Sequence, residues 1–124
     1  MSAPSRAATI RRCFDAYKTK DRPSIEAVLA EDFTFTSPYD DAIDRATYFV
    51  RCWPNSERIR EHVIERIVLQ GEEAYVTYLA RIVDGSEFRN TEFFTFRGDK
   101  VTSVTVYFGA SYRDGHFVSQ EPSD

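Results

Sequence analysis

The C-terminal half of the chain contains four β-rich segments separated by short turns. The segments are RIREHVIERIVLQ, EAYVTYLARIV, FRNTEFFTF and KVTSVTVYF, all within residues 58–108. The turns contain Gly71, Asp84-Gly85 and Gly98-Asp99, and Asp-Gly between two β-rich runs is typical of a tight hairpin. Connections this short join antiparallel neighbours. The sequence therefore predicts a four-stranded antiparallel meander, which can twist and curl because its strands are long.

Strand alternation assigns the side chains of these segments to two faces. In the first segment, Val63, Ile67 and Leu69 are predicted to share one row. His62 follows the charged run RIRE, so we expect it to be exposed. Arg66 and Arg81 are expected either in solvent or paired with acidic side chains across a dimer face.

Three amphipathic helices are predicted in the N-terminal half. The first covers residues 5–20, because its apolar positions follow helical spacing: Ile10, Cys13, Phe14 and Tyr17. A second, short helix begins after Asp21 as N-cap, with Pro23 in its first turn. Asp44 is the expected N-cap of the third helix, which carries Phe49, Cys52 and Trp53.

A short strand, DFTFTSP, lies between the second and third helices and ends at Pro38, and the following YDDAID is expected to be a loop. Helices that precede an antiparallel sheet indicate an α+β domain. We predict one domain over residues 1–124, with its core in 5–109 and a polar, frayed tail over 113–124. Three N-terminal helices would pack on a curved antiparallel sheet and give the domain a cone shape.

Charge and composition exclude several classes of function. The net charge of −4 and the pI near 5.2 argue against nucleic-acid binding. No apolar run approaches the roughly 20 residues that span a membrane, and the first residues lack the apolar core of a signal peptide. We therefore expect a cytoplasmic protein. Cys13 and Cys52 are expected to be buried free thiols rather than a disulfide.

No cofactor or metal is predicted. The two histidines, His62 and His116, have no metal-ligand spacing to each other or to the cysteines. The chain also lacks a glycine-rich phosphate loop.

One carboxylate falls in a row of apolar side chains. Glu92 shares strand parity with Phe88, Phe94 and Phe96, and its nearest polar neighbour in the row is Asn90. Burial of an unpaired carboxylate disfavours its charged form and raises its pKa, which would make Glu92 an acid or base near neutral pH. The alternative is a structural carboxylate, paired with Arg81 or hydrogen-bonded to a tyrosine.

The order of elements resembles the nuclear-transport-factor-2-like superfamily, in particular its SnoaL-like branch. The resemblance covers residues 5–109 and is carried by three segments: AVLAEDFTFTSP, DRATYFVRCWP and NTEFFTFRGDKVTSVTVYFG. The superfamily includes isomerases, polyketide cyclases, epoxide hydrolases, dehydratases and members that only bind a ligand. A shared fold alone does not indicate which of these activities a protein has.

The ketosteroid isomerases of this superfamily use a tyrosine, a base aspartate and a protonated aspartate. By resemblance, Cys13 stands at the tyrosine position, Ser37 at the base position before Pro38, and Glu92 at the position of the protonated acid. The cyclases carry an aspartate on the last strand, where TSVTVYF has none. The hydrolases need an Asp-Arg-Asp set, for which Arg81 and Glu92 could meet across neighbouring strands but a third member is missing.

The candidate catalytic residues are Glu92, Tyr17 and Asp40. Tyr17 lies one turn after Cys13 on the same helix face, and it is either a cavity residue or a core tyrosine. Asp40 and Asp41 follow the first strand, where either could supply the missing carboxylate or remain solvated. Candidate ligand-binding residues are Phe14, Phe35, Asp41, Phe49, Trp53, Asn90, Phe94 and Phe108.

These observations predict a protein that binds a small hydrophobic or polycyclic molecule in an apolar pocket. Glu92 could catalyse proton transfer or water addition there. The alternative is a non-catalytic ligand-binding or protein-interaction module of the same fold. We also expect a homodimer that pairs through the outer face of the sheet, where Ser103, Thr105 and Tyr107 share a row.

Overall fold

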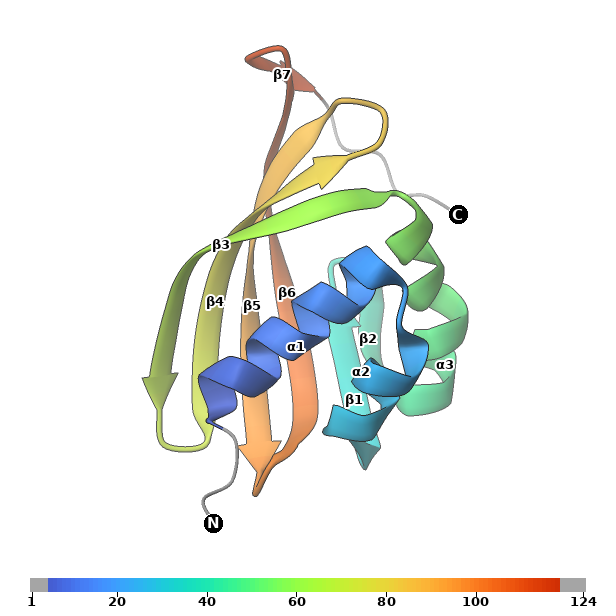
Figure 1. The fold of residues 1–124 in the computed structure, drawn as a ribbon, viewed down its shortest axis with the longest axis vertical. Helices are drawn as coiled ribbons and strands as arrows, with labels where there is room; N and C mark the ends of the chain where they lie inside the picture. The colour runs from blue at the N-terminus through green and yellow to red at the C-terminus, as the bar shows by residue number, and fades with distance from the viewer. Residues whose placement is uncertain (1–4, 119–124) are drawn as a thin grey trace.

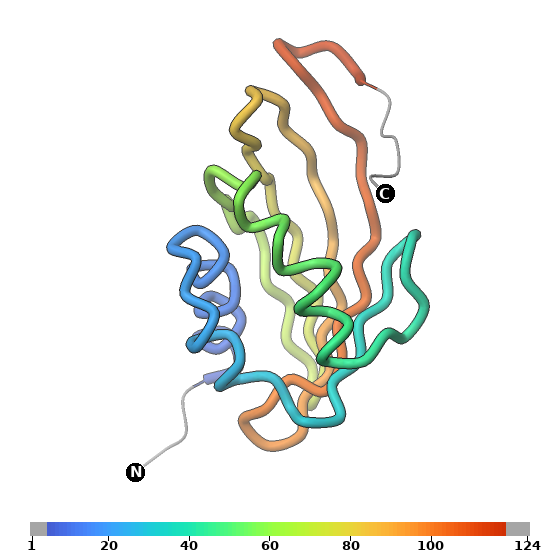
Figure 2. The backbone as a smooth tube through the Cα atoms, turned by 90° about the vertical axis from the view of Figure 1, so that its right-hand side faces the viewer, coloured from blue at the N-terminus to red at the C-terminus, as the bar shows by residue number. Residues whose placement is uncertain are grey.

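The structure of the protein, a computed structural model, describes residues 5–118. Three α-helices lie against one face of a curved seven-stranded sheet (Figure 1; Figure 2). The helices are α1 (Arg6–Thr19), α2 (Arg22–Val28) and α3 (Arg45–Arg51), with a 3₁₀ helix η1 (Trp53–Glu57) after α3. The strands are β1 (Leu29–Ser37), β2 (Asp40–Asp44), β3 (Ile59–Gln70), β4 (Glu73–Ile82), β5 (Glu87–Arg97), β6 (Lys100–Arg113) and β7 (His116–Val118).

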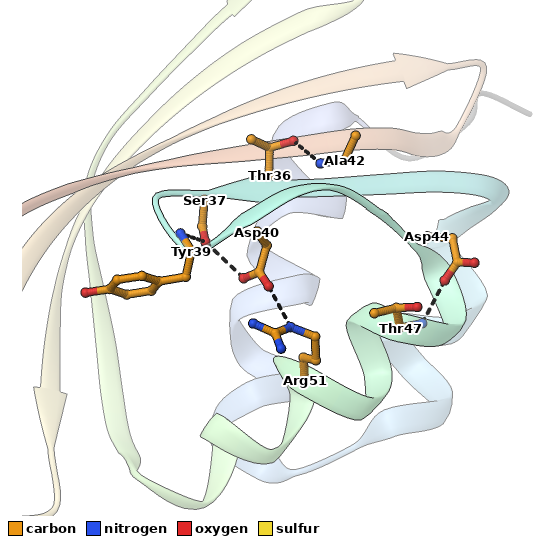
Figure 3. Close-up of polar contacts among 8 residues, drawn as sticks. All are labelled: Thr36, Ser37, Tyr39, Asp40, Ala42, Asp44, Thr47 and Arg51. Atoms are coloured by element: carbon orange, nitrogen blue, oxygen red, sulfur yellow. Dashed lines mark hydrogen bonds and ion pairs between the residues drawn. The ribbon is translucent and has the colours of Figure 1, made fainter. Parts of the chain in front are cut away.

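Each α-helix begins at a side chain that caps it. Ser5 accepts a hydrogen bond from the Ala8 amide, and Asp21 accepts one from the Ser24 amide. The Asp44 carboxylate accepts the Thr47 amide at 2.8 Å (Figure 3). The predicted caps at Asp21 and Asp44 are therefore confirmed, since each satisfies an amide at the first turn that has no partner within the helix.

The sheet has the strand order β2-β1-β6-β5-β4-β3, with β7 added to β6. The predicted meander of β3 to β6 is confirmed, because these neighbours are all antiparallel. The sheet as a whole is mixed rather than antiparallel, since β1 runs parallel to β6. A parallel partner requires a crossover, and β2, α3, η1 and the meander together supply it.

The segment YDDAID forms strand β2 where a loop was predicted. It pairs with β1, so that Phe35 lies opposite Ile43 and Thr34 opposite Asp44. The Ala42 amide, at a residue with positive φ, donates to the Thr36 hydroxyl at 3.0 Å (Figure 3). An edge strand tolerates charged side chains, which explains why this acidic segment is compatible with a sheet.

Two irregularities in β3 change which of its side chains face inward. The pairing with β4 shifts register between Ile59 and Glu61 and again between Ile64 and Arg66. As a result Ile64 and Ile67 both pack against the core, while Val63 is 39% exposed. Leu69 lies opposite the buried Ala74, on the same face as Ile67, and is 46% exposed near the end of the strand. The predicted row therefore does not hold for Val63, because the bulge between Ile64 and Arg66 reverses the alternation of the strand, whereas Ile67 and Leu69 remain on one face.

The chain continues as regular structure beyond Tyr112. β6 extends to Arg113, and β7 folds back on it with Tyr112 opposite Phe117. The prediction of a frayed tail from residue 113 is wrong as far as Val118, and residues 119–124 lie outside the described part of the chain. None of the helices within residues 5–118 is both long and apolar enough to cross a membrane.

The core lies between α1 and the inner rows of β4 and β5. Ile10, Phe33, Val76 and Val101 are almost completely buried. Cys13 and Cys52 are both buried and free, as predicted. Burial raises the pKa of each thiol to about 12, so both remain protonated at neutral pH.

Candidate functional site

The helices and the inner face of the sheet enclose a cavity of about 510 Å³. Its wall is formed by side chains of the helices α1, α2, α3 and η1, of strands β1 and β2, and of strands β3 to β6. Ligand sites in proteins commonly measure roughly 300–1,000 Å³. The cavity is therefore large enough for a small organic molecule.

Glu92 lies in the wall of this cavity, on β5. Its neighbours across the sheet are Val76 on β4 and Val106 on β6. Tyr78 donates a hydrogen bond from its hydroxyl to the Glu92 carboxylate at 2.6 Å. The side-chain amide of Asn90 donates in turn to the Tyr78 hydroxyl at 3.3 Å.

The pKa of Glu92 is raised to about 7. Desolvation by burial is the main cause, and the Tyr78 hydrogen bond lowers the value only in part. Burial and the neighbouring Glu92 raise the pKa of Tyr78 well above its usual value, so the phenol stays protonated. Glu92 is thus a carboxyl that can lose or gain a proton near neutral pH beside a tyrosine hydroxyl that keeps its own proton.

Arg81 does not meet Glu92. Its guanidinium donates to Glu87 and to Glu61, each at 2.9 Å. Arg81 alternates with buried Ala80 and Ile82 along β4, so its side chain lies on the outer face of the sheet. The possible ion pair between Arg81 and Glu92 is therefore ruled out by strand parity.

His62 lines the cavity, although the sequence predicted an exposed strand histidine. The register shift after Ile59 turns it inward, where its ring contacts Phe14, Tyr17 and Tyr78. Burial lowers the pKa of His62 to about 4, so the imidazole is neutral at pH 7. Its Nδ1 is buried and has no hydrogen-bond partner within residues 5–118.

Two tyrosine hydroxyls meet on the helical side of the cavity. Tyr17 of α1 and Tyr48 of α3 form a short hydrogen bond with each other. The edge of the Trp53 ring packs against Tyr17 with ring centroids 4.9 Å apart. Burial raises the pKa of both tyrosines far above the usual value, so this pair is uncharged at neutral pH.

Asp40 is held in place at the cavity wall by two partners (Figure 3). Arg51 donates from Nε to its carboxylate at 2.6 Å, and the Ser37 hydroxyl donates at 3.0 Å. The Asp40 side chain is only 9% exposed, whereas that of Arg51 is 52% exposed. Both carboxylate oxygens are thus engaged, and Ser37, at the base position of the isomerases, is tied to the carboxylate.

Most of the predicted site residues do line this one cavity. Those in its wall are Glu92, Tyr17, Asp40, Phe14, Phe35, Asn90, Phe94 and Phe108.

Asp41, Phe49 and Trp53 are not in the wall. Asp41 follows the inward Asp40 on β2 and is exposed. Phe49 turns away from the cavity and packs under the guanidinium of Arg22, and its neighbour Tyr48 takes the lining position. Trp53 packs behind Tyr17.

Sequence reasoning missed Tyr78, Tyr48, His62 and Arg51. Tyr78 could have been found, because it alternates with Val76 and Ala80 in the inward row of β4. Among residues 5–118, no cluster of three or more potential metal ligands occurs.

Comparison with known proteins agrees with this fold. The family model of the SnoaL-like domain matches residues 10–104. The chain belongs to the SnoaL-like domain family. No curated protein matches it in sequence.

Solved structures with a similar fold include proteins with different names and functions. A nuclear-transport-factor-2-like protein of unknown function from Cytophaga hutchinsonii has a TM-score of 0.71 and 18% identity, covering 86% of this chain and 92% of that one. A Kribbella flavida protein provisionally described as a ketosteroid isomerase has a TM-score of 0.71 and 21% identity, covering 96% and 91%. An epoxide hydrolase from M. tuberculosis has a TM-score of 0.70 and 18% identity, covering 83% and 81%. At such identities the likeness shows the fold alone.

Proposed function

We infer that the cavity binds a small, mostly apolar molecule and that Glu92 exchanges a proton with it. The observation that carries this inference is the carboxyl of Glu92, which lies in a 510 Å³ cavity with no cation beside it among the described residues and with a pKa of about 7. A perturbed carboxyl in a ligand-sized cavity is a common feature of catalytic sites. The fold is also that of proteins described as isomerases and epoxide hydrolases.

The chemistry follows from the protonation states around Glu92. Above its pKa of about 7 the carboxylate can remove a proton from a carbon acid or from an attacking water. Tyr78 remains protonated and can donate to the carboxylate or to a developing negative charge on the ligand. Phe94, Val104 and Val106 keep the surroundings apolar, which strengthens both interactions.

A second candidate is binding without turnover. It is favoured by the two aspartates of the cavity wall, because Arg51 and Ser37 already occupy the oxygens of Asp40, and Arg113 and Ser86 those of Asp84. The position before Pro38, which in the ketosteroid isomerases holds the base, is the serine bonded to Asp40. With no second free carboxylate among the described lining residues, the cavity would hold a ligand and leave it unchanged.

Turnover of two substrate classes tests the first candidate. The protein is incubated with β,γ-unsaturated ketones and with apolar epoxides, and the products are separated by chromatography. We expect the rate to increase with pH and to reach half of its maximum at about pH 7, the pKa of Glu92. We expect it to fall by about 100-fold or more in Glu92→Gln. The matched control is Glu31→Gln, since Glu31 is exposed on β1 and outside the cavity wall.

Binding is measured in parallel with N-phenyl-1-naphthylamine, a neutral apolar dye. Dye binding without any turnover would support the second candidate. A cavity that does not bind the dye would contradict both.

A further inference from the structure

A cluster of charged side chains forms one end of the cavity. Arg58, Asp84, Ser86 and Arg113 all line it. They come from the residue between η1 and β3, the β4–β5 hairpin and the end of β6. In Figure 1 this hairpin and the end of β6 extend beyond the helices, so the cluster lies where the helices no longer cover the sheet.

One carboxylate in this cluster, that of Asp84, is bonded to one guanidinium group and lies near a second. Arg113 donates to Asp84 at 3.0 Å, and the amide and hydroxyl of Ser86 donate to the same carboxylate at 2.9 and 2.6 Å. The Ser86 hydrogen bonds lower the pKa of Asp84 most, and the charges of Arg113 and Arg58 lower it further. Arg58 therefore lies close to a carboxylate whose oxygens are already bonded to other groups.

Arg58 itself forms no salt bridge within residues 5–118. The other arginine of the cavity wall, Arg51, is paired with Asp40. Apart from Glu92, the wall thus contains three arginines and two aspartates, although the chain as a whole carries a net charge of −4. Positive charge is concentrated at the end of the cavity formed by Arg58 and Arg113.

We propose that this end of the cavity binds an anionic group of the ligand, a carboxylate, sulfonate or phosphate, with Arg58 as its main contact. A planar guanidinium can donate two parallel hydrogen bonds to such a group. The anion would form the direct ion pair that Arg58 lacks within the described residues. The proposal rests on the proposed function, because it assigns a chemical class to the ligand of the same cavity.

The geometry of β5 gives the ligand its shape. Phe88 lies four residues before Glu92, which corresponds to about 14 Å along the strand. Phe88 is paired with Ser111, two residues before Arg113. A ligand that contacts both ends is therefore an elongated ring system or chain, with its acidic group at the end away from Glu92.

Two dyes of the same ring system test the proposal. N-phenyl-1-naphthylamine is neutral, and 1-anilinonaphthalene-8-sulfonate carries one sulfonate on the same rings. We expect the wild-type protein to bind the sulfonate more tightly than the neutral dye. We expect Arg58→Gln to weaken sulfonate binding by about fivefold and to leave the affinity for the neutral dye unchanged. The matched control is Arg60→Gln, which removes the same charge from an exposed position outside the cavity wall.

The outcomes separate this proposal from the proposed function. If the neutral dye binds and Arg58→Gln changes neither affinity, the anion site is wrong and the apolar cavity stands. If the neutral dye does not bind, the proposed function fails and the anion site fails with it. Salt gives a second measurement on the wild-type protein. Raising NaCl from about 50 mM to about 500 mM should weaken only sulfonate binding, and equal salt dependence of both dyes would overturn the proposal.

Discussion

Glu92 explains why a carboxylate can occupy a row that is otherwise apolar. Its side chain is bonded to Tyr78 and has no cationic partner among the described residues. Below its pKa of about 7 the group is neutral and is hydrogen-bonded within the cavity. Above that pH the protein retains a buried negative charge at a cost in stability. Such a cost at one residue is typical of functional sites.

The first prediction concerns the pH dependence of stability. The pKa of Glu92 is raised from 4.5 to about 7 by folding. Between these values the folded state holds a proton that the unfolded state has lost, so stability falls as pH rises and then levels off above about 7. Glu92→Gln removes this loss and keeps an acceptor for Tyr78. We expect the variant to match the wild type at pH 4 and to exceed it by up to about 3 kcal/mol at pH 8.

Urea unfolding of both proteins across this pH range measures the difference. Comparing the two proteins at each pH cancels the contribution of other titrating groups. A difference that does not change with pH would mean that Glu92 titrates with an ordinary pKa.

The second prediction concerns the hydroxyl of Tyr78. This hydrogen bond is what lowers the pKa of Glu92 against the effect of burial. Tyr78→Phe removes it, so the pKa of Glu92 should rise above 7 and any base-catalysed rate should shift to higher pH. Carboxyl titration by NMR measures the change. Tyr48→Phe is the control, because Tyr48 bonds to Tyr17 and not to Glu92. An equal pKa in the wild type and in Tyr78→Phe would show that the hydroxyl does not act on the carboxylate.

At the scale of elements, the sequence correctly predicted features that depend on residues close to one another in the chain. The inward row of β5 followed from strand alternation, and Asn90, Phe94 and Phe96 are buried as that row requires. The caps at Asp21 and Asp44 followed from side chains that bond to the backbone nearby.

The predictions that were wrong concern features that depend on contacts between residues distant in sequence. The bulges in β3 form against β4, and they alone decide that His62 faces the cavity and that Val63 does not. Strand β2 forms only because β1 is available to pair with it. The Arg51–Asp40 pair requires α3 to return beside that hairpin (Figure 3). Sequence patterns carry no information on such placements, so His62 and Arg51 were not predicted as site residues.

The third prediction concerns the junction of β5 and β6 at Gly109. The register shifts there, between Phe88 and Asn90, and the Gly109 amide donates to the Asn90 side chain at 3.2 Å. A Cβ on Gly109 would lie 2.1 Å from the carbonyl oxygen of Arg89. We expect Gly109→Ala to destabilise the protein by about 2–4 kcal/mol, because backbone must move to relieve the contact.

Thermal and urea unfolding measure this effect. The control is Ala110→Ser at the exposed neighbouring position, which should change stability by less than about 0.5 kcal/mol. Equal stability of Gly109→Ala and the wild type would show that the strands can separate there without cost.

At the scale of the whole molecule, the two faces of the curved sheet carry side chains of different chemistry. The inner face carries Glu92, Tyr78 and the cavity. The outer face carries aromatic side chains, among which the exposed Tyr75 and the half-buried Phe93 pack with ring centroids 4.8 Å apart. Tyr75 is 50% exposed and Tyr107 is 57% exposed. Apolar side chains gathered on one face are typical of an interaction surface.

The last prediction is that the protein forms a homodimer through this outer face. Closed two-fold dimers are the commonest soluble oligomers, and their interfaces are enriched in tyrosine and phenylalanine. In a two-fold dimer each interface residue occurs once in each subunit. Tyr107→Glu would therefore place two negative charges in the interface and should convert the dimer to a monomer. Light scattering at tens of micromolar measures the mass. Val50→Glu is the control, since Val50 is 74% exposed on α3, away from the sheet, and should leave the dimer intact. A wild-type protein that is monomeric at this concentration would contradict the prediction, and a Tyr107→Glu variant that remains dimeric would place the interface elsewhere.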